Sequence, residues 1–160
     1  MSIVQETRVV NGSIEKAWAA ISKMGAVEEW HPNVAKVEVL TEHDSGIGAS
    51  RRVTFHDGIG SVETVVKESE QKFSTVEMTE MQMMKNAFIT ISIKEISDEK
   101  TEVTFLIDYG TTMGPIGWLM ARLMMNRILR KVFVIALAGL SYHLETGERV
   151  TDSVPGHEAK

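Results

Sequence analysis

The chain has 160 residues, no cysteine and a formal net charge of −5 at pH 7. This length suits a single domain with a sizeable core, and the ordinary apolar and charged fractions, 43% and 24%, exclude a disordered chain. The lack of cysteine excludes disulfides, thiolate nucleophiles and cysteine-based metal sites, and the negative charge provides no general attraction to nucleic acid.

The first thirty residues predict a strand followed by two helices. Residues 3–10 alternate apolar and polar side chains, which is typical of a strand. Ser13 can cap the helix that follows, whose buried face would hold Ile14, Ala17, Trp18 and Ile21. A short second helix is expected over residues 26–30, because Pro32 disfavours the helical conformation of the residue before it.

From residue 34 onward the apolar side chains recur at every second position, which indicates strands. Six such runs follow, at residues 37–39, 51–55, 61–67, 76–78, 89–93 and 103–109. Turn-forming residues separate them, for example Asp57-Gly58 and Lys85-Asn86. Short turns between successive strands predict an antiparallel meander, and the first strand brings the sheet to seven strands.

Residues 115–146 predict one long C-terminal helix that begins at Pro115. One broad face would hold Trp118, Ala121, Met124, Met125, Ile128, Leu129, Val132, Ile135, Ala136 and Gly139. The opposite face would hold Arg122, Asn126, Arg127, Arg130 and Lys131. The helix is apolar all round over residues 132–140, which is far short of the ~20 residues that span a bilayer. The apolar face of the sheet has to be covered, and only this helix is long enough to cover it.

These elements predict an α+β fold in a single domain over residues 1–147. The polar segment 148–160, which contains proline and glycine, is expected to be a disordered tail. The first ten residues have neither a positively charged start nor a long apolar run, so we expect a cytoplasmic protein without an export signal.

Four features make residues 1 to about 146 resemble the START-like superfamily, which includes polyketide cyclases, the birch-pollen-allergen fold and steroidogenic lipid-transfer domains. They are the helix start Ser13 to Trp18, the string Glu29-Trp30-His31-Pro32, the spacing from Gly48 through Arg51 and Asp57-Gly58 to Glu63, and the long last helix. The resemblance implies a helix-grip fold, in which the antiparallel sheet curls around the C-terminal helix and leaves a cavity between them.

The resemblance also implies an apolar ligand in that cavity, either lipid-like, aromatic or polyketide-like. The protein would then be a binding module, and the alternative is an acid–base enzyme of the polyketide cyclase or dehydratase type. The residues expected to line the cavity are Trp30, Val53, Phe55, Met78, Ile91, Phe105, Tyr109, Met125, Ile128 and Val132.

Four polar residues are candidates for chemistry, and each has a structural alternative. His31 could exchange protons near neutral pH, or it could only shape the turn before Pro32. Arg51 would lie inside the groove if it faces inward with Val53 and Phe55, with Glu63 on the next strand as its partner; alternatively, Arg52 and Thr54 face inward. Tyr109 could present its hydroxyl to the cavity, or lie in the core.

Ten methionines are many for this length, and they suit either an adaptable pocket or gap-filling in the core. The histidines show no pair at ligand spacing and the glycines form no phosphate loop, so neither a metal nor another cofactor is expected. A homodimer that buries Leu119, Leu123, Val134 and Leu137 is possible, although strand edges could cover these side chains equally well.

Overall fold

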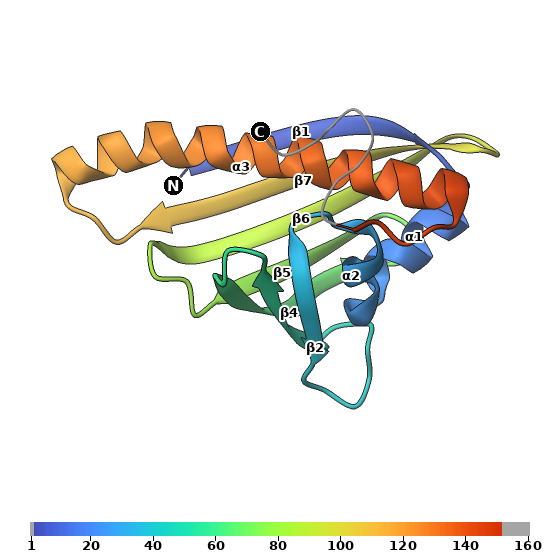
Figure 1. The fold of residues 1–160 in the computed structure, drawn as a ribbon, viewed down its shortest axis with the longest axis horizontal. Helices are drawn as coiled ribbons and strands as arrows, with labels where there is room; N and C mark the ends of the chain where they lie inside the picture. The colour runs from blue at the N-terminus through green and yellow to red at the C-terminus, as the bar shows by residue number, and fades with distance from the viewer. Residues whose placement is uncertain (1, 152–160) are drawn as a thin grey trace.

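Seven strands and one long helix make up most of the structure, a computed structural model that describes residues 2–151 (Figure 1). In chain order the elements are β1 (Ser2–Asn11), α1 (Ile14–Ser22), the 3-10 helix η1 (Met24–Ala26), α2 (Val27–Trp30), β2 (Val34–Val39), β3 (Ser50–Phe55), β4 (Gly60–Ser69), β5 (Phe73–Thr79), β6 (Met84–Ser97), β7 (Lys100–Thr111) and α3 (Pro115–Thr146). The predicted α+β helix-grip fold is confirmed.

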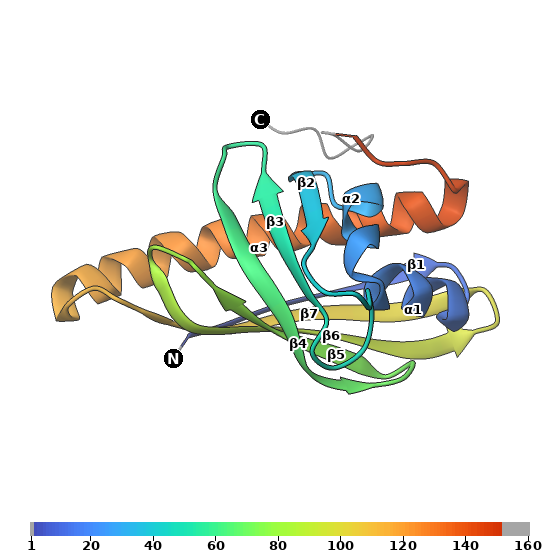
Figure 2. The same cartoon turned by 90° about the horizontal axis from the view of Figure 1, so that it is seen from below.

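The strands form a single antiparallel sheet in the order β1-β7-β6-β5-β4-β3-β2. Successive strands from β2 to β7 are neighbours, as expected for a meander, and β1 pairs with β7 at the far edge. The sheet curls around α3, which lies along β1 and crosses the concave side (Figures 1 and 2). This curvature keeps β3 and β4 away from the helix axis and leaves room between them.

Helix α1 begins as the sequence predicts, because the Ser13 side chain accepts a hydrogen bond from the Lys16 amide at 3.2 Å. The helix buries Ala17, Ala20 and Ile21 against the sheet. The Trp30 indole N–H donates to the Ala20 carbonyl at 3.0 Å, and this bond ties α2 to α1. The side chain of Trp30 is thereby fixed at one end of the space under the sheet.

Most of the predicted apolar face of the last helix turns toward the sheet, but one edge of that face does not. Asn126 and Arg122, which were assigned to the polar face, are only half exposed, whereas Met124 and Ile128 of the predicted apolar face are exposed. The helix carries apolar residues on nearly every side, so its pattern did not determine its rotation. The inward side holds Ala121, Met125, Leu129, Val132, Phe133 and Ala136.

The chain remains ordered for a few residues beyond α3. Gly147, with a left-handed φ of 71°, ends the helix, and its N–H donates to the His143 carbonyl at 2.8 Å. Val150 is buried and its N–H donates to the Glu29 carbonyl at 2.8 Å, while Arg149 pairs with Glu28. Part of the expected disordered tail is therefore held against α2 and α3, since the Val150 side chain also packs with Ala138 and Tyr142. Residues 152–160 lie outside the described residues.

No helix within residues 2–151 combines the length and the apolar character needed to cross a membrane.

Candidate functional site

A cavity of about 420 Å³ lies between the concave side of the sheet, α2 and the middle of α3. Its wall is mainly apolar and includes Val53, Val76, Met78, Ile89, Ile91, Phe105, Ile107, Leu129, Val132 and Phe133. The exposed lining residues His56 and Asp57 of the β3–β4 turn, with the half-buried Met81 and Met84, mark the side that opens to solvent. Its volume falls within the range typical of small-molecule sites.

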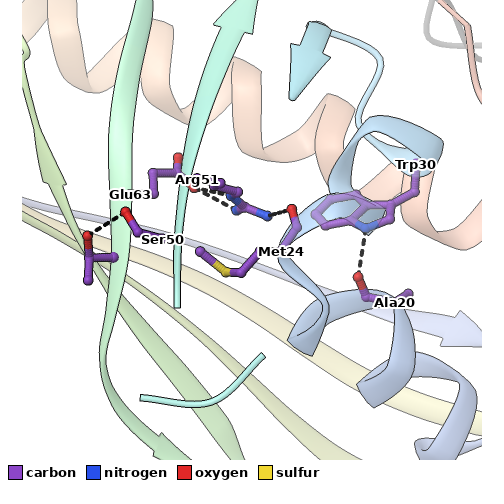
Figure 3. A network of polar contacts seen from close by, with 7 residues as sticks. Ala20, Met24, Trp30, Ser50, Arg51 and Glu63 are labelled. Carbon is purple, nitrogen blue, oxygen red and sulfur yellow. Dashed lines mark hydrogen bonds and ion pairs between the residues drawn. The ribbon is translucent and has the colours of Figure 1, made fainter. Parts of the chain in front are cut away.

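One ion pair lies in this apolar wall (Figure 3). Arg51 and Glu63 are directly opposite each other on β3 and β4, and both point inward. Arg51 Nε donates to Glu63 Oε2 at 2.8 Å, and Nη2 lies 2.6 Å from the same oxygen. On its other side, Nη1 donates to the Met24 carbonyl at 2.9 Å. The guanidinium thus connects the sheet to η1 across the floor of the cavity.

The burial of Arg51 and Glu63 determines how their ion pair affects the stability of the protein. The two side chains are 10% and 7% exposed, so each has lost most of its hydration, and each depends on the other for compensation. The next residue shows the contrast, because Arg52 points outward and pairs with Glu80 in solvent. Of the two orientations left open by the sequence, the structure has Arg51 inward and Arg52 outward.

His31 lies beside this pair as a neutral imidazole. Removal from water, with a smaller contribution from the positive charge of Arg51, lowers the pKa of His31 from 6.5 to about 3. The Asn33 amide donates to His31 Nδ1 at 3.3 Å, which leaves the ring proton on Nε2. The ring packs between Trp30 and Phe55, with centroid distances of 5.7 and 6.1 Å. His31 is therefore a hydrogen-bond donor in the cavity wall at neutral pH.

Tyr109 is fully buried away from the cavity. Its hydroxyl donates to Asn126 Oδ1 of α3 at 2.5 Å, and burial raises the pKa of the phenol above its ordinary value. This contact fixes α3 against β7 and accounts for the inward position of Asn126. Of the two roles considered for Tyr109, the structure has the one in the core.

The structure brings most of the expected site residues together. The cavity wall contains His31, Arg51, Glu63, Trp30, Val53, Phe55, Met78, Ile91, Phe105 and Val132. Three expected lining residues are elsewhere: Tyr109 and Met125 pack in the core, and Ile128 is 55% exposed on the outer side of α3. Ile128 belongs to the edge of the predicted helix face that turns outward.

Other lining residues were not predicted. Met24 belongs to η1, a 3-10 turn for which the sequence pattern gave no signal, and Ser74 is a small polar residue in an alternating strand. The methionines divide between the two expected roles and a third, since Met78, Met81 and Met84 line the cavity, Met125 lies in the core, and Met120 and Met124 are exposed. Among residues 2–151, no three metal-ligating side chains come together.

Known proteins resemble this chain both in sequence and in fold. The model of a family described as polyketide cyclase / dehydrase and lipid transport matches residues 1–145. No curated protein matches the sequence.

Three solved structures illustrate the likeness in fold. Protein XoxI from Bacillus cereus is 16% identical with a TM-score of 0.76, over 91% of this chain and 97% of its own. The ZhuI aromatase/cyclase from Streptomyces sp. R1128 is 16% identical with a TM-score of 0.73, over 90% and 93%. A START superfamily protein from Mycobacterium smegmatis is 17% identical with a TM-score of 0.69, over 89% and 98%. At these identities the likeness concerns the fold alone.

Proposed function

Because the chain belongs to the family described as polyketide cyclase / dehydrase and lipid transport, we propose that it binds a small apolar molecule between the curled sheet and α3. The observation that carries this proposal is the cavity itself, about 420 Å³ with a predominantly apolar wall. A cavity lined in this way loses little when its water is replaced by an apolar ligand, and the ligand gains by leaving water.

The polar groups of the wall narrow the class of ligand. His31 Nε2 is a donor, and Arg51 has more N–H groups than the three bonds to Glu63 and Met24 use. The ligand we propose is therefore apolar over most of its surface and carries one acceptor oxygen, such as a carbonyl, phenol or carboxylate. An acceptor placed near His31 or Arg51 would gain a hydrogen bond in a dry environment.

A cavity-filling variant tests the proposal. Anilinonaphthalene sulfonate, an aromatic probe with an anionic oxygen group, is titrated into the protein and its fluorescence is recorded. Ile91 of β6 lines the cavity, so Ile91→Trp would fill it and should abolish saturable binding. Ser92→Trp adds the same side chain to the opposite face of the same strand and should bind as the original protein does. Equal binding by both variants would contradict the proposal, provided that both unfold cooperatively.

A second function, catalysis of the cyclase or dehydratase type, is favoured by the presence of His31 and Arg51 in one cavity. Such an enzyme needs a base whose conjugate acid has a pKa near the working pH. His31, with a pKa lowered to about 3, is too weak a base, and Glu63 already accepts from Arg51. The residues thus support binding with hydrogen-bond donation better than they support proton abstraction.

Incubation with a poly-β-ketone distinguishes the two functions. Mass spectrometry should recover the compound unchanged if the protein only binds it. Loss of water from the compound that disappears in His31→Asn would instead establish the enzyme.

A further inference from the structure

The outer face of α3 is unusually apolar for a surface. We define this face as the side chains of Ile116, Leu119, Met120, Leu123, Met124, Arg127, Ile128 and Lys131. Ile116 is 82% exposed, and Met120 and Leu123 are each 68% exposed. Single exposed apolar side chains are common, but five of them within three turns form a patch that usually meets a partner.

The charge on this helix has a single sign from Pro115 to Leu144. Between Asp108 and Glu145 the sequence has four cationic residues and no acidic one, although the whole chain carries −5. Arg130 pairs with Glu6 at 3.2 Å and Arg122 lies over the Trp118 ring. Arg127 and Lys131 are exposed, and neither forms an ion pair with any residue from 2 to 151. The outer face therefore offers an apolar stretch followed by free cations.

The outer face of α3 lies near one of the turns that border the cavity opening. In both views the β5–β6 turn lies toward the same end of the molecule as the N-terminal half of α3, whereas the β3–β4 turn lies near the middle of its length (Figures 1 and 2). These two turns border the opening of the cavity, and each presents an exposed apolar side chain, Ile59 and Met83. The outer face of α3 thus lies at the end of the molecule where the β5–β6 turn borders the opening.

We propose that the outer face of α3 docks on a membrane surface that contains anionic lipids. Apolar side chains backed by cations are the composition of helices that lie in the interface plane, with the apolar groups among the acyl chains and the cations at the headgroups. A second copy of the chain fits less well, because this stretch of the helix has no acidic residue that could pair with Arg127 and Lys131 of a symmetric partner. The proposal does not rest on the proposed function.

Sedimentation with vesicles tests this docking. The protein should sediment with phosphatidylglycerol-rich vesicles and remain in solution with pure phosphatidylcholine vesicles. The double variant Met120→Asp/Leu123→Asp should abolish sedimentation, and Arg127→Gln and Lys131→Gln should each weaken it about fivefold. Ile96→Asp and Ile3→Asp, combined in one control, add the same two charges at exposed apolar positions on β6 and β1 and should bind normally.

Three outcomes would overturn the proposal. They are no sedimentation with either vesicle, equal sedimentation of the α3 variant and the control variant, and a dimer in light scattering that Met120→Asp/Leu123→Asp converts to monomer. The last outcome would assign the face to a second copy. Because the vesicles carry no added ligand, Ile91→Trp should sediment like the original protein, so failure of docking and failure of cavity binding are separate results.

Discussion

Gly139 of α3 lies directly against the backbone of Trp30. A Cβ atom at Gly139 would stand 2.2 Å from the Trp30 carbonyl oxygen and 2.7 Å from Cδ of Pro32. Only glycine allows the two backbones to approach this closely. The contact brings α2, which carries part of the cavity wall, against the buried half of the helix.

Gly139→Ala should therefore destabilise the protein by about 3 kcal/mol, since neither a backbone carbonyl nor a proline ring can move aside as a flexible side chain can. Thermal or urea unfolding measures this change. Gly117→Ala in the same helix is the control, because its Cβ would meet only the flexible Met113 side chain at 3.3 Å. That variant should gain up to about 1 kcal/mol from better helix propensity. A loss of stability in both variants would show that the Trp30 contact is not the cause.

The Arg51–Glu63 pair should show strong coupling in a double-mutant cycle. Arg51→Met or Glu63→Leu alone leaves a buried charge without its partner and should cost about 3–5 kcal/mol. The double variant removes both charges, so it should be clearly more stable than either single variant. Urea unfolding of the four proteins gives the coupling energy, and additive losses would contradict this prediction.

The exposed pair on the other side of β3 provides the matched comparison for that cycle. Arg52→Met and Glu80→Leu, alone and together, should leave the unfolding midpoint nearly unchanged, because water and salt screen this pair.

The neutral state of His31 should make stability depend on pH. The pKa is about 3 in the folded protein and 6.5 in the unfolded chain, so between these values the unfolded chain binds a proton that the folded protein does not. The contribution of neutral His31 to the free energy of unfolding is therefore fully present above pH 6.5 and is lost as the pH falls toward 3. His31→Asn keeps an acceptor for the Asn33 amide but cannot titrate. The difference in unfolding free energy between the two proteins should shift over this range in favour of the variant, and parallel pH profiles would contradict the argument.

Tyr109→Phe should separate stability from ligand binding. The variant removes the hydrogen bond to Asn126 and leaves that partly buried amide oxygen without its donor, which should cost about 1 kcal/mol in urea unfolding. Binding of anilinonaphthalene sulfonate should be unchanged, because Tyr109 lies outside the cavity wall. Weakened binding in this variant at a temperature where it is fully folded would place Tyr109 in the site after all.

The strand pattern was sufficient to predict the sheet, and the resemblance to a known superfamily placed a cavity beneath it. Strands with alternating apolar and polar side chains, joined by short turns, allow few arrangements other than a meander. The same alternation predicted that residues such as Val53 and Phe55 point inward. The partner of Arg51 was also predictable, because a hairpin turning at residues 57–60 places Glu63 opposite it.

The rotation of α3 was not predictable in the same way. A helix with apolar residues on every side has several faces that could be buried, and contacts such as Tyr109 with Asn126 choose among them. The predicted apolar face also included Met124, whereas its side chain is exposed. The Met24 carbonyl, which accepts from Arg51, could not be found from side-chain patterns because it is a backbone group in an irregular turn.

The residues after Gly147 are needed in any shortened form of this protein. Stopping the chain at the end of α3 would remove Val150 from its buried seat, break its bond to the Glu29 carbonyl and free Glu28 from Arg149. Burial of the Val150 side chain alone contributes about 2 kcal/mol to the free energy of unfolding. These contacts hold α2, so their loss would loosen α2 together with Trp30 and His31 at the end of the cavity. A truncated protein would then bind a ligand more weakly than the full chain, even if its sheet and α3 were intact.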